Sequence, residues 1–551
     1  MKILIIGGYG VFGGRLAQLL SDEPRLTLFI AGRTLHKAEQ FCAGIEGAAT
    51  MVPVALDRSN PSEQLASLAP EMVVDATGPF QDYGDDRYAL VEAAIAHKIH
   101  YLDFADGADF VFGVSRFDAA AKAAGVFVFS GVSSFPVLTA AVLREFAKTM
   151  TIESVTGGIA PSPYAGIGLN VMRAVVGYAG SPVKLQRGGK PSSGVGLAES
   201  MRYVIAAPGK VPLNSIHFSL VDVPDLQVLP PEHPSITDLW IGAGPVPEIL
   251  YRILNLLAKL RHRLKLPSML PLSSLFYWVL NKMKFGEHRG GMFVAAMGQN
   301  GGKPASQSWH LLAEGDDGPF IPSMAIEGIV RKALAGDMPA AGARAATHAL
   351  ELNDYDKLFD GRTIHTGIRD DLAQAPLYQH VLGTAYDKLP PRVQELHGSS
   401  DKRSWSGMAK VARGKGPFAA IAARMFRFPK SADAVAVQDD FTPTAKGELW
   451  ERRFGDHCFN SLQYAGTSKN EHLIIEQFGP VKIALALRAE EDRLYLVPRR
   501  WTMLGVPLPK FLLPQGNTFE TERDGKFVFD VELALPIFGL IVSYKGSLLP
   551  D

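Results

Sequence analysis

The chain opens with a short apolar run, residues 2–6, that leads directly into a glycine-rich loop. Gly8, Gly10 and Gly13 of this loop have G-x-G-x-x-G spacing, and residues 14–20 are predicted to form a helix. A strand, a glycine loop and a helix in this order predict a βαβ unit that binds a dinucleotide. One glycine permits the tight turn, one lets the backbone approach a pyrophosphate, and one lets helix and strand pack closely. The alternative is an ordinary turn between a strand and a helix.

Arg33 indicates which dinucleotide this loop would bind. It follows the second apolar run, residues 26–31, in the region where an NAD-binding chain usually carries Asp or Glu. No acidic residue stands beside it, and arginine presents a planar fork of N–H donors that suits phosphate. The sequence therefore predicts NADP(H) rather than NAD(H). The alternative is that Arg33 is a solvated surface residue.

Length and composition set wider limits. A chain of 551 residues is too long for one hydrophobic core and predicts about three domains. Lys and Arg together number 56, as do Asp and Glu, so no global basic charge points to nucleic acid. Only two cysteines are present, Cys42 and Cys458, which favours a reducing compartment. We expect no signal peptide and no membrane span, and therefore a cytoplasmic protein.

Residues 1–135 alternate short apolar runs with helical patterns, which is typical of parallel βαβ units. Four further strands are predicted at residues 51–56, 72–74, 99–102 and 126–129, with helices such as 90–96 and 117–124 between them. We therefore expect an α/β protein whose N-terminal domain is a Rossmann fold, a doubly wound parallel sheet. Ligands of such sheets bind outside the carboxyl ends of the strands.

The remainder of the chain divides into two further predicted domains. Residues 136–370 carry strand-like runs at 216–221 and 292–297 and a helical pattern at 326–335, so we expect a second, α+β domain for substrate binding and homodimer formation. Residues 372–551 are predicted to be helical and loop-rich up to residue 428, including the basic stretch 399–415. From residue 429 onward, repeated alternating runs predict a β-rich meander or curved sheet.

Two loops complete the predicted cofactor site. The loop after the fourth strand, residues 75–80, should pass the nicotinamide half of the cofactor, and Thr77 could donate to ribose or carboxamide; a tight turn is the alternative. Asp57, after the third strand, could accept from the adenine amino group or simply cap a helix. The predicted cofactor-binding residues are Gly8, Tyr9, Gly10, Val11, Phe12, Gly13, Arg33, Thr34, Asp57, Ala76, Thr77, Gly78, Pro79 and Phe80.

The catalytic group is less sharply indicated. Polar residues follow the fifth and sixth strands, among them Asp103, Asp106 and Ser130, and a dehydrogenase needs a proton donor or acceptor beside the hydride path. Asp103 and Tyr83 are the candidates; the alternative is that these residues cap helices or loops. No Tyr-x-x-x-Lys pair, G-x-S-x-G elbow, H-E-x-x-H or C-x-x-C motif occurs, and no metal site is predicted.

Residues 247–265 combine a broad apolar face with cationic residues towards one end, and residues 270–280 add further apolar length. Helices of this kind can lie on membrane surfaces. The segment 247–285 is therefore a candidate for peripheral membrane contact. The alternative is a helix pair packed into the second domain or into a dimer interface.

Five segments resemble the saccharopine dehydrogenase-like NADP-binding oxidoreductase family. They are residues 7–13, 31–33, 73–80, 101–103 and 130–136, and the likeness covers residues 1 to about 140 well and the middle domain loosely. Residues 376–549 resemble a domain of unknown function, DUF4166, at segments 382–383, 389–391, 450–454, 504–509 and 543–546. The family includes amino-acid reductases and enoyl reductases that act on complex lipids. The resemblance implies NADP(H) and hydride transfer, but it names no substrate.

Two functions of different class remain open. The first is an NADP(H)-dependent oxidoreductase that transfers hydride to or from a C=N, C=C or C=O group of a small molecule. A β-rich domain that shelters an apolar substrate would favour a lipid-like one. The second is a non-catalytic NADP- or lipid-binding protein. Turnover of NADPH with a panel of enoyl, imine and carbonyl compounds distinguishes them.

Overall fold

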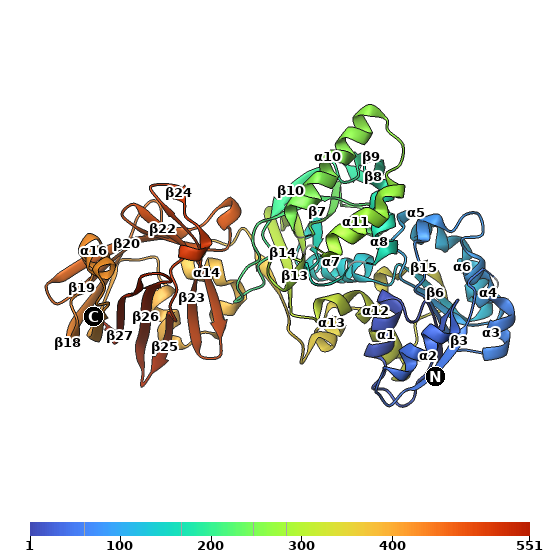
Figure 1. The fold of residues 1–551 in the computed structure, drawn as a ribbon, viewed down its shortest axis with the longest axis horizontal. Coiled ribbons are helices and arrows are strands. Elements are labelled where there is room, and N and C mark those ends of the chain that lie inside the picture. The colour runs from blue at the N-terminus through green and yellow to red at the C-terminus, as the bar shows by residue number, and fades with distance from the viewer. Residues whose placement is uncertain (60, 167, 246, 283) are drawn as a thin grey trace. The chain divides into compact units, whose positions relative to one another are not determined.

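The computed structural model describes residues 1–59, 61–166, 168–245, 247–282 and 284–551 (Figure 1). The chain forms two compact units. The first unit comprises residues 1–202, 216–307 and 312–364, and the second comprises 203–215, 308–311 and 365–551. Two short segments from the middle of the chain therefore belong to the second unit. The three-domain division expected from the sequence remains a prediction.

A parallel sheet forms the dinucleotide-binding part of the first unit. Its strands lie in the order β15-β6-β5-β4-β1-β2-β3, and their pairings in the described residues are parallel. The strands are β1 (Lys2–Ile6), β2 (Thr27–Gly32), β3 (Thr50–Ala55), β4 (Met72–Asp75), β5 (His100–Asp103), β6 (Phe127–Ser130) and β15 (Gly342–Ala345). The order 3-2-1-4-5-6 is that of a Rossmann fold, so this prediction is confirmed.

Helices connect these strands and cover the sheet. They are α1 (Val11–Leu19), α2 (Leu35–Ala43), α3 (Ser62–Leu68), α4 (Ala89–Ala96), α5 (Ala108–Gly113) and α6 (Asp118–Ala124). A later helix, α12 (Ile321–Leu334), packs beside α1 (Figure 1). There the Ser323 hydroxyl donates to the Phe12 carbonyl at 3.1 Å, and Arg331 donates to the Leu19 carbonyl at 3.0 Å. Late segments of the chain thus return to complete the N-terminal fold.

A second, mixed sheet occupies the middle of the chain, and six of its seven strands follow the order β10-β11-β12-β7-β13-β14. β7 pairs in parallel with β12 and antiparallel with β13, which confirms the expected α+β organisation. These strands are β7 (Thr151–Ala160), β10 (Ser200–Tyr203), β11 (Ile216–Leu220), β12 (Asp238–Ala243), β13 (Arg289–Asn300) and β14 (Lys303–Glu314), with β8 (Pro182–Arg187) and β9 (Lys190–Val195) as a separate hairpin. Its helices are α7 (Thr139–Ala147), α8 (Leu169–Tyr178), α9 (Asp225–Glu232) and α13 (Leu352–Phe359).

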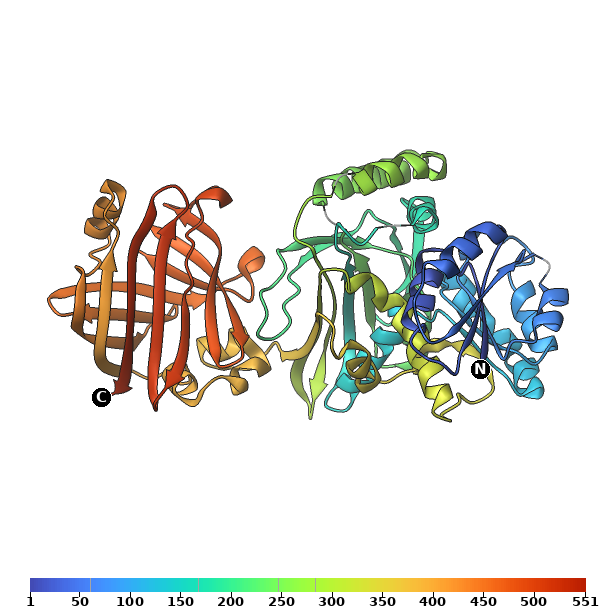
Figure 2. The ribbon, with the colours of Figure 1, turned by 60° about the horizontal axis from the view of Figure 1, so that its bottom comes forward.

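Two helices, α10 (Glu248–Leu264) and α11 (Ser273–Lys282), follow β12 in the first unit (Figure 2), and many of their apolar side chains are exposed. α10 buries Tyr251, Leu254 and Ala258 against the first unit. We define the α10–α11 apolar surface as the exposed side chains of Ile249, Ile253, Leu256, Leu260, Leu264, Leu275 and Trp278. Among the described residues, no helix combines the length and the apolar character needed to cross a bilayer.

The second unit contains a closed antiparallel sheet. Within residues 403–550, ten strands follow the order β22-β21-β20-β19-β18-β17-β27-β26-β25-β23, and pairing of β22 with β23 closes the ring into a barrel. The strands are β17 (Arg403–Arg413), β18 (Ala432–Pro443), β19 (Glu448–Phe454), β20 (His457–Ala465), β21 (Ile474–Phe478), β22 (Val481–Glu490), β23 (Arg493–Met503), β25 (Phe519–Arg523), β26 (Lys526–Leu535) and β27 (Gly539–Pro550). The short β24 (Val506–Pro507) pairs with β23, and β16 (Ile364–Asp370) leads the chain into this unit.

One sequence expectation for this unit is wrong. The basic stretch 399–415 is not helical or loop-like, because it contains the eleven-residue strand β17. Trp405, Ala409 and Val411 point into the barrel core, whereas Met408 and Lys410 are exposed, so the strand does alternate. The helices α14 (Leu377–Leu382) and α15 (Pro391–His397) precede this strand, and α16 (Pro417–Met425) follows it.

Candidate cofactor and active site

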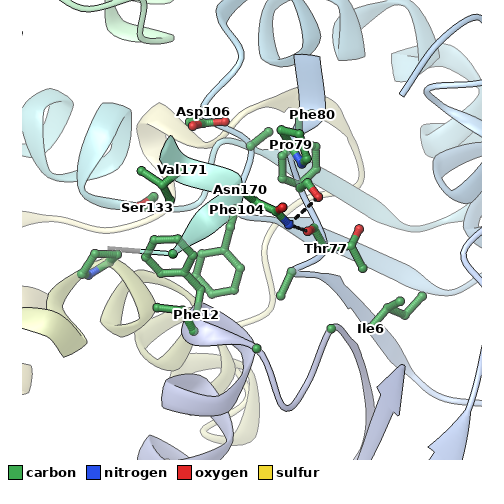
Figure 3. Close-up of a pocket in the computed structure, with 18 of the residues that line it drawn as sticks. Ile6, Phe12, Thr77, Pro79, Phe80, Phe104, Asp106, Ser133, Asn170 and Val171 are labelled. Carbon is green, nitrogen blue, oxygen red and sulfur yellow. Dashed lines mark hydrogen bonds between the residues drawn. The ribbon is translucent and has the colours of Figure 1, made fainter. Parts of the chain in front are cut away.

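A cavity of about 820 Å³ lies in the first unit, outside the carboxyl ends of β1, β2, β4 and β5 (Figure 3). Its volume falls within the range of small-molecule and cofactor sites. The residues predicted from the sequence that line it are Tyr9, Gly10, Val11, Phe12, Arg33, Asp57, Ala76, Thr77, Gly78, Pro79, Phe80 and Tyr83. Gly8, Gly13, Thr34 and Asp103 are not part of the lining.

The glycine loop brings the backbone close to this cavity. The Gly7 N–H donates to the Ala31 carbonyl at 2.8 Å, and Gly7 has φ +81°, a left-handed conformation that glycine adopts most readily. A β-carbon at Gly13 would lie 2.4 Å from the Gly7 carbonyl oxygen, so this glycine is needed for the close approach of α1 to the loop. Gly7 lines the cavity, although it was not among the cofactor-binding residues predicted from the sequence. Gly8 and Gly13 do not line the cavity; a side chain at either would collide with neighbouring atoms.

The N-terminus of α1 is free to bind an anion. Its N-cap is Gly10, which offers no capping side chain, and no acidic residue lies in the first turn. The first N–H groups of a helix lack intrahelical partners and carry partial positive charge. Because Gly10, Val11 and Phe12 line the cavity, these donors suit a pyrophosphate, which fits the prediction from the glycine spacing.

The ends of β2 and β3 form the polar rim of the cavity. Arg33 is exposed there, and Asp57 accepts from the Ser59 N–H at 3.0 Å and from its hydroxyl at 2.7 Å. These hydrogen bonds, with a smaller contribution from Arg33, hold the pKa of Asp57 below its usual value. Asp57 is not the cap of α3, whose N-cap residue is Pro61. Thr34 donates its backbone N–H to the Tyr9 hydroxyl at 3.2 Å.

A buried carboxylate organises the loop after β4. Asp75 accepts from the Thr77 hydroxyl at 2.6 Å and from its N–H at 3.1 Å, and its other oxygen accepts from Arg58 at 2.7 Å. The hydroxyl hydrogen of Thr77 is therefore already used, so Thr77 does not offer a cofactor the hydroxyl donor expected from the sequence. The Tyr83 hydroxyl lies 2.5 Å from the Thr77 hydroxyl, and the Arg58 guanidinium stacks 3.6 Å above the Tyr83 ring.

Asn170, at the start of α8, fixes the same loop from the opposite side. Its amide donates to the carbonyls of Thr77 at 3.0 Å and Gly78 at 2.9 Å (Figure 3). Both Asn170 and Arg58 line the cavity, and sequence reasoning missed both. Arg58 directly follows the predicted Asp57 and could have been considered with it. Nothing near Asn170 in the sequence links it to a loop more than 90 residues earlier.

The wall of the cavity nearest β5 is largely aromatic and aliphatic. The rings of Phe12 and Phe104 stack with centroids 5.6 Å apart, and Phe80 and Val171 extend this wall (Figure 3). Asp106 is the acidic group on this side, where the Gln81 amide donates to it at 3.2 Å. Burial raises the pKa of Asp106.

A second acid lies near Asp106. Burial, with the negative charges of Asp109 and Asp106, raises the pKa of Asp222 to about 6. Burial also keeps the pKa of Tyr178 well above its usual value, with further contributions from Asp222 and Asp106. Neither Asp222 nor Tyr178 was singled out from the sequence, because each lies in a segment without a recognisable motif.

The two predicted catalytic residues have different surroundings. The Asp103 side chain is fully buried, and one of its oxygens accepts from the Gly131 N–H at 2.7 Å, the Ala105 N–H at 2.9 Å and the Ser130 hydroxyl at 3.1 Å. Tyr83 lines the cavity, but burial and Asp75 raise the pKa of its phenol, which stays neutral. These contacts give Asp103 a structural task, and the catalytic role of both residues remains a prediction.

Family models match both ends of the chain. Residues 3–129 match the model described as "Saccharopine dehydrogenase NADP binding domain", and residues 389–548 match "Domain of unknown function (DUF4166)". Both matches confirm the resemblances inferred from the sequence, and the first assigns the N-terminal domain to an oxidoreductase type. A search of curated proteins found no match.

Three of the solved structures that match this chain are distant from it. An amine dehydrogenase from Mycobacterium smegmatis is 9% identical over 62% of this chain and 94% of its own, with a TM-score of 0.33. A probable dehydrogenase from Thermotoga maritima is 11% identical over 62% and 91%, with a TM-score of 0.32. A DAP dehydrogenase from C. glutamicum in complex with DAP is 12% identical over 66% and 98%, also with a TM-score of 0.32.

Proposed function

We propose that this chain, whose residues 3–129 belong to the saccharopine dehydrogenase NADP-binding domain family, is an NADP(H)-dependent oxidoreductase. The observation that carries the proposal is the cavity of about 820 Å³, into which the glycine loop, Arg33 and the loop of Thr77 all open. Its residues fit a dinucleotide, because the N-terminus of α1 is uncapped and Gly13 leaves no space for a side chain. When bound, NADPH would supply a hydride from nicotinamide C4.

The chain's own residues would bind and orient the two halves of the cofactor. N–H groups at the start of α1 would bind the pyrophosphate, and Arg33 would bind the 2′-phosphate of the adenine half. Asp75 and Asn170 hold the Thr77–Gly78 loop in place, so its small residues can lie against the nicotinamide. A cleft that is prearranged in this way would favour a productive orientation of cofactor and substrate.

The wall formed by Phe12, Phe80, Phe104 and Val171 supports an apolar substrate with a C=N, C=C or C=O group. Reduction of such a group also needs a proton, and Asp106 is the acid that both lines this wall and has a raised pKa. We assign proton donation to Asp106 in preference to Asp103, which does not reach the cavity. Asp106→Asn should lower turnover at least tenfold and leave NADPH affinity within about twofold of wild type.

The first test is a titration of the full chain with NADPH and NADH, for wild type and Arg33→Ala. Charge-assisted hydrogen bonds contribute about 1.5–3 kcal/mol, so the variant should bind NADPH at least tenfold more weakly and NADH almost unchanged. Lys37→Ala, an exposed cation on α2 outside the cavity lining, is the matched control and should bind both as wild type does. Equal affinity of wild type for the two nucleotides would remove the NADP assignment.

The second candidate function is a non-catalytic NADP- or lipid-binding protein. It is favoured by the position of Asp103, because the acid first expected to be catalytic is buried away from the cavity. NADPH oxidation with any member of an enoyl, imine and carbonyl panel would support the oxidoreductase. Tight NADPH binding with no turnover across the panel, and no effect of Asp106→Asn, would support the binding protein.

A further inference from the structure

The barrel of the second unit contains a cavity of its own, of about 350 Å³. It lies between α16 and strands β21, β22, β23, β26 and β27. Side chains that point inward from these strands make its wall apolar, and they include Ile483, Leu485, Leu496, Val531, Leu533 and Val542. A packed protein interior leaves few voids larger than a water molecule, so a space of this size is a candidate binding site.

The other end of the barrel is filled. Trp405, Phe441, Trp450 and Phe527 are almost completely buried there, and the Trp450 ring meets Phe441 edge to face at 4.7 Å. Tyr378 from α14 and His397 from α15 stack on each other at 3.6 Å beside these rings. The cavity therefore has a closed floor and can open only at the end where α16 lies.

That open end is bordered by exposed apolar side chains. Ile421 and Met425 of α16 and Met503 of β23 line the cavity and are also 59%, 61% and 40% exposed. Leu504 and Ile537, next to lining residues in the chain, are exposed as well. Clustered exposed apolar side chains commonly mark a ligand or interaction site. Here they form an apolar entrance that continues into an apolar interior.

The deep end of the cavity is polar and nearly neutral in charge. Glu476 and Tyr544 line it, and one oxygen of Glu476, Oε1, accepts from the Ser461 hydroxyl at 2.8 Å and lies 3.4 Å from Arg452. Burial lowers the pKa of Arg452, but the Glu476 carboxylate, together with Tyr544, Asp439 and Tyr378, raises it above its usual value, so the ion pair persists. The hydrogen bonds to Glu476 in the described residues all involve Oε1, which leaves Oε2 to accept from a ligand.

We propose that this cavity binds a single-chain, uncharged lipid with a terminal hydroxyl, such as a long-chain alcohol. The alkyl chain would occupy the apolar wall, and the hydroxyl would donate to Glu476 Oε2 and accept from the phenol of Tyr544. A fatty carboxylate fits less well, because its charge would face Glu476, which already neutralises Arg452. The proposal concerns the second unit alone and does not depend on the oxidoreductase function.

The test is displacement of N-phenyl-1-naphthylamine from the full chain, without nucleotide, by 1-dodecanol, 1-methoxydodecane and dodecanoate. The alcohol should bind at least fivefold more tightly than the ether, which has no donor, and more tightly than the carboxylate. 1-Decanol should bind about fifteenfold more weakly than 1-dodecanol, since it lacks two methylenes and each buried methylene contributes roughly fourfold. Dodecanoate as the tightest ligand would overturn the proposed head group, and no displacement by any of the three would overturn the site.

Two variants locate the site. Leu533→Trp places a large ring in the cavity and should weaken dodecanol binding at least tenfold, whereas Asn460→Trp, on the exposed side of β20, should not. Tyr544→Phe should weaken binding of the alcohol and of the ether alike, because the oxygen of each would accept from the phenol. If Leu533→Trp and Asn460→Trp melt at the same temperature and bind dodecanol equally, the ligand is not in this cavity. NADPH affinity should be unchanged in all three, which separates this test from that of the proposed function.

Discussion

A single methyl group added at Gly13 would disrupt the contact between α1 and the glycine loop. A β-carbon there would lie 2.4 Å from the Gly7 carbonyl oxygen and 3.0 Å from its carbonyl carbon, and both atoms are backbone. Gly13→Ala should therefore push α1 away from the loop, lower the free energy of unfolding by about 1–3 kcal/mol and weaken NADPH binding at least tenfold. Thermal unfolding and nucleotide titration measure the two effects.

Gly44 provides the control for that substitution. It follows α2 with φ −91°, and the nearest atoms to an added β-carbon are 3.6 Å away, an ordinary contact distance. Gly44→Ala should leave NADPH binding unchanged and stability nearly so. Wild-type affinity in Gly13→Ala would show that the loop and α1 do not form the pyrophosphate site.

The raised pKa of Asp103 predicts how the stability of the chain changes with pH. Burial raises its pKa to about 7 in the folded chain, whereas an unfolded Asp titrates near 4. Between these pH values the folded state binds more protons than the unfolded state, so the contribution of Asp103 to stability falls as pH rises. Urea unfolding across this range should show a smaller loss of stability with rising pH in Asp103→Asn than in wild type.

The exposed Asp85→Asn serves as the control and should keep the wild-type pH dependence. An identical slope in Asp103→Asn and wild type would contradict the raised pKa. The same variant also tests the catalytic assignment: a proton donor at Asp103 requires turnover to fall more than NADPH affinity. Unchanged turnover would show that Asp103 is not the proton donor and that its role is to accept hydrogen bonds from Gly131, Ala105 and Ser130.

Residues of the cofactor site differ in how far the sequence alone could identify them. The glycines and Arg33 are recognisable because the strand, the loop and the helix that hold them are neighbours in the chain. Arg58 and Asn170 reach the cavity through partners at Asp75 and Thr77, and such partners are set by tertiary packing. Asp106 could be placed near the cleft, but its raised pKa depends on burial that only the folded chain reveals.

Strands were predictable where burial on both faces leaves a continuous apolar run, as in β1, β2 and β4. β15 was not, because Gly-Ala-Arg-Ala carries no such run and pairs with β6 from more than 200 residues away. β17 was obscured by its basic residues, although only Lys410 among them is exposed and Arg403 is largely buried against Glu448. The β17–β27 pairing on which the ring also depends was equally hidden, since it joins residues 405–413 to residues 542–550.

The α10–α11 apolar surface predicts binding to anionic membranes. Lys259, Arg263 and Lys265 are exposed among its leucines, so charge and apolar area would act together on an acidic bilayer. We propose that the full chain sediments with phosphatidylserine-containing vesicles and less with pure phosphatidylcholine. Leu256→Glu should reduce binding at least tenfold, because it places a charge within the apolar surface.

Leu35→Glu, at an exposed leucine on α2, is the matched control and should bind vesicles as wild type does. If Leu256→Glu has no effect, the membrane proposal fails. Loss of a homodimer in Leu256→Glu, measured by sedimentation velocity without lipid, would instead assign the surface to a second copy of the chain.

At the scale of the whole molecule, the two compact units should respond separately to their ligands. A ligand that binds only the folded state adds stability of RT ln(1 + [L]/Kd), about 2.7 kcal/mol at 100 times Kd. NADPH should therefore raise the unfolding temperature of the first unit, and 1-dodecanol that of the second. Calorimetry checks this, and an equal shift of every transition by either ligand would contradict it.

The second unit is assembled from three separate segments of the chain, so a single cut between them should not separate its parts. In that unit the buried Arg369 donates to the Ala206 carbonyl at 2.8 Å, and Ala206 donates to His310 at 3.1 Å. A nick after residue 364 would leave residues 203–215 and 308–311 on one fragment and the barrel on the other. Neither fragment would contain a whole second unit, so the halves should remain associated after cleavage and reassemble when expressed as a split protein.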